Sequence, residues 1–341
     1  MTSSPGRPVA IVAAASALHP VYHGPEATLV MTCVNEVRQA AGVDRVDFTM
    51  AGSCDYLAGS PFVFVMNIEG MGAWPPIYES HVEMDGAWAL FEAWLRLQVG
   101  DVDTALVVGS GRPSVGNQRE VFSLQTDPYT MAPLGLDPVS LAGLQARALL
   151  EAGIATEADF AAAAGRALPG MDPGDLLAAP YFNDPLRSHD VATPTDGAAA
   201  VLLVAGDRVA EFTDTPVWIT GMDHRVESHH LGLRDLTRSP SAAAAAAHAG
   251  AADGPIDVAE LMVVHSPEEI VLRNALGLGA DTRINPSGGP FAANPIMATG
   301  LMRVVEVARR IASGEARRGL AHASSGPCLQ QNLVAVLEGE L

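Results

Sequence analysis

The stretch that decides the fold is Asn285-Pro-Ser-Gly-Gly-Pro-Phe-Ala-Ala-Asn-Pro-Ile-Met-Ala-Thr-Gly300. Its adjacent glycines, Gly288 and Gly289, allow the backbone to turn where a Cβ atom would clash. Asn294-Pro295 then favours an extended step, because a residue that precedes proline avoids the helical region. Apolar residues recur at helical spacing from Met297 onward. The stretch therefore predicts a rigid loop that leads into a buried helix.

Outward from this loop, short apolar strands alternate with helices. Residues 8–14 form a continuous apolar run typical of a central strand, and an amphipathic helix is expected over residues 26–41, ending at Gly42. A second strand is expected at residues 46–50. Strand, helix and strand in this order predict the parallel sheet of an α/β protein.

Two later segments extend the pattern. A segment that starts at Pro75 is expected to enter a buried helix that runs to about Val99, and a strand should follow at residues 100–109. Another strand is expected over residues 257–265, with His265 as its last residue. The carboxyl end of a parallel strand is the usual position for chemistry, so His265 is a candidate site residue. The alternative is a core histidine satisfied by hydrogen bonds.

Composition limits the classes of protein. The chain has 341 residues, of which 48% are hydrophobic and 17% are charged, as expected for two cores or one large α/β domain. Apolar stretches end well before the roughly 20 residues that a membrane span needs, so no span is predicted. The polar N-terminus does not resemble a signal peptide. Three cysteines without paired spacing favour a reducing cytoplasm and argue against a zinc site made by this chain alone.

The charge of the chain argues against one class of partner. The formal net charge is −19, and all 20 basic residues are arginine. Binding of nucleic acid without regard to sequence needs clustered lysine and arginine to neutralise phosphates, so we expect no nucleic-acid partner. The negative net charge does not exclude a local basic patch that binds the phosphates of coenzyme A (CoA).

The two halves of the opening stretch together resemble a known signature. Residues 285–289 followed by residues 294–300 are similar to the thiolase-superfamily motif, an Asn-Pro-Ser/His-Gly-Gly run, a short spacer and Gly-His-Pro-x-Gly-Ala-Thr-Gly. The resemblance implies an α/β thiolase fold, with two similar βαβαβαββ halves packed as a five-layer αβαβα sandwich and an inserted loop lobe. It places the N-terminal half at residues 1–110 and 191–212, the lobe at 111–190 and the C-terminal half at 213–341.

The resemblance also implies changed catalytic positions. The histidine that binds the thioester oxygen in thiolases corresponds to Asn294. When Gly86 and Ala89 are aligned with the thiolase Cys-x-Ser-Gly-x-x-Ala segment, Glu83 occupies the position of the nucleophilic cysteine. Glu83 is a candidate acid or base, with helix capping as its alternative, and the neighbouring Asp85 is expected to cap the helix.

The second thiolase cysteine has no clear equivalent. By order along the chain it corresponds to Ser324 or Ala323, and Cys328 lies a few residues later. Cys328 could enter the site through the altered loop. Cys54, in the turn after the second strand, is the other cysteine that could be reactive, although a lone cysteine is more often inert.

A chain that lacks these residues resembles the lipid-transfer-protein branch of thiolase-like proteins. Some members of that branch cleave steroid side chains by a retro-aldol reaction. We therefore expect an acyl-CoA-binding subunit of a C–C lyase that cleaves a β-hydroxyacyl-CoA from a sterol. Its expected catalytic residues are Glu83, His265 and Asn294, and its expected substrate-binding residues are Ser287, Gly288, Gly289 and Cys328.

The same resemblance implies partners and leaves alternatives. The expected partners are an acyl-CoA ester, a protein with a zinc ribbon and an OB fold, and a second thiolase-like subunit in a homodimer or heterodimer. No covalently bound cofactor is expected, with a CoA thioester as substrate. One alternative is a non-catalytic thiolase-like subunit of a heteromeric complex. A third hypothesis is an unconventional acetyl-CoA acetyltransferase that uses Cys54 or Cys328.

Overall fold

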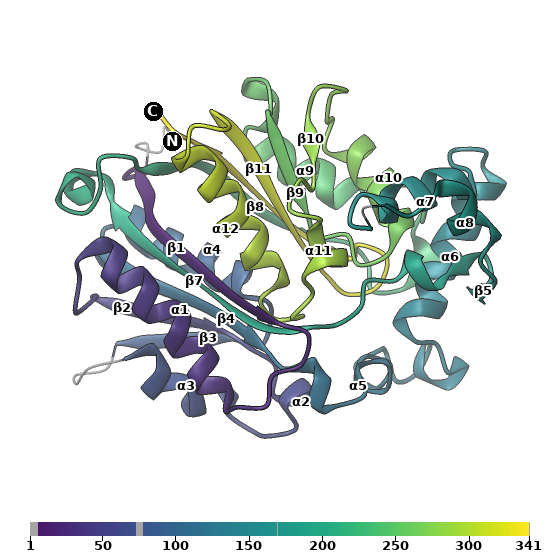
Figure 1. The fold of residues 1–341 in the computed structure, drawn as a ribbon, viewed down its shortest axis with the longest axis horizontal. Coiled ribbons are helices and arrows are strands. Elements are labelled where there is room, and N and C mark those ends of the chain that lie inside the picture. The colour runs from purple at the N-terminus through teal and green to yellow at the C-terminus, as the bar shows by residue number, and fades with distance from the viewer. Residues whose placement is uncertain (1–5, 73–77, 169, 341) are drawn as a thin grey trace.

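A computed structural model describes residues 6–72, 78–168 and 170–340. Its main feature is a ten-stranded sheet with strand order β10-β9-β11-β12-β8-β1-β7-β4-β2-β3, covered by helices (Figure 1). The sheet divides at the contact between β1 and β8, where only Ala10 pairs with Trp218 and Ile11 with Val217. Each side of this contact holds five strands.

The two sides have the same topology. The N-terminal side contains β3 (Glu79–Val82), β2 (Phe48–Gly52), β4 (Thr104–Gly111), β7 (Asp196–Ala205) and β1 (Val9–His19). The C-terminal side contains β10 (Arg283–Ile284), β9 (Val258–Leu261), β11 (Arg318–Ser325), β12 (Gln331–Glu338) and β8 (Val217–Val226).

On each side the first two pairings, counted from the outer edge, are parallel and the last two are antiparallel. The chain is therefore built from two similar halves.

Helices form three layers around these strands. The central pair is α4 (Gly86–Gln98) and α12 (Thr299–Ala312), which contact each other and both halves of the sheet. The outer helices of the N-terminal half are α1 (Glu26–Ala41), α2 (Asp55–Ala58) and α3 (Val63–Met71). The C-terminal half carries α9 (Pro240–His248), α10 (Ser266–Ala275) and α11 (Gly289–Ala292).

A separate lobe lies between β4 and β7. It holds α5 (Gln118–Leu124), α6 (Pro138–Glu151), α7 (Glu157–Gly165) and α8 (Pro173–Ala178), with a small second sheet of β5 (Tyr181–Asn183) and β6 (Leu186–Arg187). Figure 1 shows α6, α7 and α8 gathered beside α10, away from β1. The predicted residue boundaries of the lobe and the halves stay a prediction.

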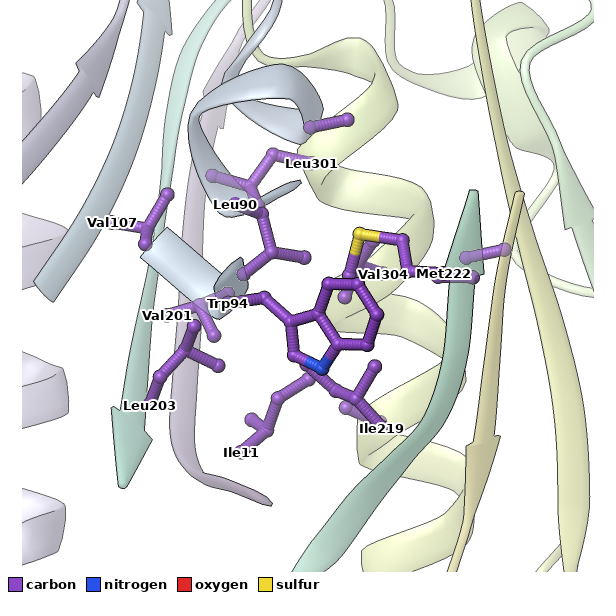
Figure 2. Close-up of a cluster of buried hydrophobic side chains, with 14 of the residues drawn as sticks. Ile11, Leu90, Trp94, Val107, Val201, Leu203, Ile219, Met222, Leu301 and Val304 are labelled. Atoms are coloured by element: carbon purple, nitrogen blue, oxygen red, sulfur yellow. The ribbon is translucent and has the colours of Figure 1, made fainter. Parts of the chain in front are cut away.

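Three buried apolar clusters hold the layers together. In β7, alternate residues face opposite sides: Val201 and Leu203 pack with the central helices, whereas Leu202 and Val204 pack with α1. Figure 2 shows the central cluster, in which Trp94 of α4 lies among side chains from both halves. A third cluster covers the outer face of the C-terminal half beneath α9 and α10. This layering confirms the predicted five-layer α/β fold.

One expected element differs from the structure. The strand expected to end at His265 ends at Leu261, and His265 instead precedes α10 as its N-terminal cap. The buried helix expected to run to about Val99 is α4, which begins at Gly86 and ends at Gln98, after β3 and a short turn. Residues 75–77 of the segment expected to enter that helix lie outside the described residues.

One buried carboxylate joins the two central helices. Asp85, only 3% exposed, precedes α4 and accepts a hydrogen bond from Ala87 N at 2.8 Å, which confirms its predicted capping role. The same side chain accepts from Gly300 N at 2.8 Å and Leu301 N at 2.9 Å in the first turn of α12. Burial raises the pKa of Asp85 to about 6, while the amide donors oppose that rise by favouring the charged form.

The junction requires glycine at two positions. A Cβ atom on Gly300 would lie 2.6 Å from Asp85 Oδ1, and one on Gly86 would lie 2.9 Å from the Cα atom of Gly109. Any larger residue would push the helix starts apart. The glycine that ends the quoted signature therefore allows the two helices to share one cap.

Replacement of this shared cap should destabilise the fold. At pH 8, Asp85→Asn places an N–H₂ group against backbone N–H groups and leaves at least one buried donor unpaired, which costs about 1–3 kcal/mol. Urea unfolding followed by circular dichroism measures the loss. Asp172→Asn is the control, because Asp172 caps the single helix α8 and, among the described residues, accepts only from Gly174 N. Equal free energies of unfolding for Asp85→Asn and Asp172→Asn would contradict the role of Asp85 as a cap shared by α4 and α12.

A second buried polar group, the imidazole of His322, makes the stability of the fold depend on pH. His322 on β11 is 1% exposed, with Nε2 2.9 Å from Asn332 Oδ1. Its Nδ1 atom has no partner within the described part of the chain. Burial lowers the pKa of His322 from 6.5 to about 4, because a charged imidazole would lose its hydration.

Acid should therefore destabilise the protein through His322. Between pH 6.5 and pH 4 the unfolded chain binds a proton at this residue and the folded chain does not, so the free energy of unfolding falls by about 3 kcal/mol. His322→Gln should flatten this part of the stability curve, measured by urea unfolding at each pH. His248→Gln, at an exposed position on α9, is the control. A curve for His322→Gln parallel to the wild-type curve would disprove the assignment.

Candidate functional site

A cavity of about 940 Å³ opens where the two halves meet the lobe. Its walls include the residues that follow β2, β3 and β9, and the turn between β11 and β12. The lobe contributes residues from the segments before and within α5 and α6. The site therefore lies at the carboxyl ends of parallel strands from both halves, as in other α/β proteins.

The cavity brings together four of the residues expected from the sequence. Glu83, His265, Asn294 and Cys328 all line it, and so do Cys54 and Ser324. Ala323, the alternative to Ser324 for the second thiolase cysteine, packs instead in the central core. Ser287, Gly288 and Gly289 are not among the described residues that line the cavity.

His265 is held by a buried carboxylate. Its Nδ1 atom lies 3.0 Å from Glu268 Oε1. Glu268 Oε2 accepts from Val264 N at 2.9 Å and from His265 N at 3.2 Å. His265 is 8% exposed and Glu268 is 5% exposed, and both line the cavity. The pair is therefore fixed by the backbone at the start of α10.

Asn294 presents an amide to the cavity. Its Oδ1 atom accepts from Thr299 Oγ1 at 3.0 Å, and its backbone is tied to Thr195 through two hydrogen bonds of 3.0 Å. Among the described residues, no partner engages its Nδ2 atom. This N–H₂ group is therefore available to donate a hydrogen bond to a ligand oxygen.

Glu83 lies in the turn between β3 and α4. Its Oε2 atom accepts from Asp55 N at 3.0 Å, so the turn after β2 holds the side chain. Loss of solvent around the carboxylate raises the pKa of Glu83, and the nearby charge of Asp55 also raises it. A carboxyl group with a raised pKa holds its proton closer to neutral pH, which suits an acid.

The turn between β11 and β12 carries Cys328. The Cys328 thiol donates to Leu141 O at 3.3 Å and is 6% exposed. Burial raises the pKa of this thiol to about 12, and the charge of Glu268 adds to the rise. Arg234 fixes the turn by donating to Pro327 O at 3.0 Å and to Cys328 O. The Cys328 thiol therefore forms part of the cavity wall and is a poor nucleophile at neutral pH.

The Asn-Pro-Ser-Gly-Gly run lies behind the cavity wall. Ser287 donates from N to Glu260 Oε1 at 3.0 Å and from Oγ to Glu260 Oε2 at 2.6 Å. Arg303 of α12, 1% exposed, donates to Glu260 Oε2 and to Ser287 Oγ, both at 2.9 Å. These bonds anchor the loop between β9 and α12, so we interpret Ser287 and the two glycines that follow it as support for Asn294.

Sequence reasoning missed Glu268. Comparison with the thiolase motif drew attention to His265 alone, and the glutamate three residues later matched nothing. The available signal was the spacing of a capping box, in which a glutamate at the third helical position reaches back to the cap. The cap here is a histidine, which is outside the usual set of Ser, Thr, Asp and Asn.

Residues 6–72, 78–168 and 170–340 contain no group of three or more His, Cys, Asp or Glu side chains that could hold a metal ion. Within the same ranges, no helix has both the length and the apolar character that a membrane crossing requires.

Comparison with known proteins supports the fold. No family model matches the chain. A curated relative, the acetyl-CoA acetyltransferase of Methanothermobacter thermautotrophicus, is 31% identical over 166 residues, which are 42% of this chain and 43% of that protein. The aligned part thus spans less than half the length of the curated relative.

Solved structures match over the whole length. Human mitochondrial 3-ketoacyl-CoA thiolase superposes with a TM-score of 0.79 at 15% identity, covering 98% of this chain and 99% of that one. The Ltp2-ChsH2(DUF35) aldolase superposes with a TM-score of 0.77 at 16% identity, covering 99% of each chain. The human thiolase in complex with CoA gives 0.77 at 15% identity over 98% of each chain. The protein described here has the thiolase fold.

Proposed function

We propose that the chain is the acyl-CoA-binding subunit of a retro-aldolase that cleaves a β-hydroxyacyl-CoA. The observation that carries the proposal is the cavity that holds His265, Asn294 and Glu83 together and offers Cys328 only as a thiol with a raised pKa. Retro-aldol cleavage needs a base, a donor for an enolate oxygen and a proton source, and it needs no covalent acyl-enzyme.

Each residue has a role in this reaction. His265 takes the proton of the β-hydroxyl group, and the bond between Cα and Cβ breaks as Cβ becomes a carbonyl carbon. The electron pair moves onto the thioester as an enolate, whose oxygen accepts a hydrogen bond from Asn294 Nδ2. Glu83 returns a proton to Cα, giving a shortened acyl-CoA and an aldehyde or ketone.

The size and lining of the cavity suit a bulky apolar acyl chain. Its volume of about 940 Å³ lies at the upper end of the range of small-molecule sites. Apolar side chains from the lobe and from the loop before α12 form part of the wall, among them Phe122, Leu141, Phe182 and Met297. A sterol side chain is the acyl group that we propose.

A partner protein completes the proposal. Arg119 is the one arginine among the described lining residues, and it is already paired with Asp137. The phosphates of CoA therefore need positive charge from outside this wall. A partner with an OB fold and a zinc ribbon is our proposed source, and the aldolase neighbour is itself named as a complex with a DUF35 protein.

The same scarcity of free positive charge favours a second candidate function. In that case the chain is a non-catalytic thiolase-like subunit, which supplies one wall of a site whose reacting groups lie on another chain. Cleavage by a complex whose activity is unaffected by changes at His265, Asn294 and Glu83 would support this candidate.

The experiment measures cleavage of a β-hydroxyacyl-CoA by the chain co-purified with its OB-fold partner. His265→Ala and Asn294→Asp should each lower kcat about 100-fold or more, because the base or the enolate donor is lost. Asp at position 294 can still accept from Thr299, so the loop is preserved. Glu83→Gln should slow protonation of the enolate at Cα, because an amide cannot donate the proton, and His248→Ala is the control at an exposed position.

Labelling of cysteine tests the thiolase-type alternative. With a pKa near 12, about one Cys328 thiol in ten thousand is ionised at pH 8, so iodoacetamide should modify it far more slowly than a free thiol. Cys328→Ser should keep cleavage activity, as should Cys33→Ser, whose thiol lies on the buried face of α1 and also has a pKa raised to about 12. Rapid labelling of Cys328 that abolishes activity would instead favour a covalent mechanism.

A further inference from the structure

Hydrogen bonds fix the geometry of His265 and Glu268 in the cavity wall. Both carboxylate oxygens of Glu268 are engaged: Oε2 by the amides of Val264 and His265, and Oε1 by His265 Nδ1 at 3.0 Å. The carboxylate cannot rotate without losing two backbone hydrogen bonds. Its direction, and that of the imidazole ring, are therefore set by the start of α10.

The contact with Glu268 favours one form of the histidine. With Glu268 as a carboxylate, which has no proton to donate, the hydrogen between the two side chains belongs to His265 Nδ1. A neutral imidazole with its proton on Nδ1 has a lone pair on Nε2. Within the described residues, Nε2 has no hydrogen-bond partner, and the side chain lines the cavity.

We propose that Glu268 is a positioning residue, which holds His265 in the Nδ1–H tautomer and so presents the Nε2 lone pair to a hydroxyl group in the cavity. The proposal rests on the proposed function for the identity of that hydroxyl. When Nε2 takes the proton, the fixed charge of Glu268 stabilises the imidazolium that forms.

A purely structural role for Glu268 predicts something different. As a member of a capping box, Glu268 satisfies two amides at the start of α10, and a glutamine can also do this through its single carbonyl oxygen. In Glu268→Gln the N–H₂ group then faces Nδ1 and donates to it. The ring proton moves to Nε2, and the lone pair is lost from the cavity. The variant thus keeps the cap and removes the base.

The matched control is the next residue. Glu269 is 3% exposed and pairs with Arg166 and with Arg273, 3.6 Å away. It is not among the described residues that line the cavity. Glu269→Gln therefore changes the charge by the same amount on the same helix without a contact to His265.

The first readout does not depend on activity. Long-range ¹H–¹⁵N correlation spectra of the full chain labelled with [¹⁵N]histidine report which ring nitrogen carries the proton, and loss of one signal set in His265→Asn gives the assignment. Wild type and Glu269→Gln should show the Nδ1–H form. Glu268→Gln should show the Nε2–H form, with the midpoint of thermal unfolding close to that of Glu269→Gln.

The second readout is kinetic, on the complex with the OB-fold partner. Glu268→Gln should lower kcat about 100-fold or more and leave KM roughly unchanged, because the lost interaction acts on the proton transfer. An Nδ1–H tautomer in Glu268→Gln, or a kcat equal to that of Glu269→Gln, would overturn the positioning role. If the spectra show the tautomer change while the wild-type complex cleaves nothing, the positioning role stands and the proposed function fails.

Discussion

The shared cap at Asp85 is the constraint on which the rest of the structure depends. One carboxylate accepts three backbone N–H groups from the starts of α4 and α12, one helix from each half of the chain. These helices form the middle layer, so the cap fixes the two halves against each other at the floor of the cavity. Gly86 and Gly300 allow the approach because no side chain fits there.

The same cap changes which chemistry the fold can perform. A helix N-terminus can lower the pKa of a nearby thiol or stabilise an anion, because its amide groups point at the ligand. At α4, Ala87 N donates to Asp85 and Gly86 N donates to Met297 O, so these donors are already used. Polar groups in the cavity wall come from side chains, among them Glu83, Asn294 and the His265–Glu268 pair. Acid–base chemistry at these side chains fits the site better than attack by a thiolate.

Much of the fold could be predicted from local pattern. The helix over residues 26–41 matches α1 because its apolar spacing and the glycine after it are both local signals. The capping role of Asp85 was predicted for α4, but its second role at α12 was not, since Gly300 is distant in the sequence and near only in space. The wall formed by the lobe depends on such distant contacts too.

The candidate site was predicted less completely than the fold. Glu83, His265, Asn294 and Cys328 were expected there and do line one cavity. Ser287 was expected to contact substrate, but its partner Glu260 lies on β9, and no local pattern reveals that pairing. Glu268 was missed because a histidine cap lies outside the common capping residues. Ser287 and Glu268 are thus side chains whose surroundings are set by tertiary contacts.

Isotope incorporation in D₂O tests the central claim most directly. The complex is incubated with a β-hydroxyacyl-CoA in D₂O, and the shortened acyl-CoA and the intact protein are analysed by mass spectrometry. Retro-aldol cleavage predicts one deuterium at Cα of the product, no need for free CoA and an unchanged protein mass. A product that forms only with added CoA, together with a protein that gains the mass of an acyl group, would contradict the account.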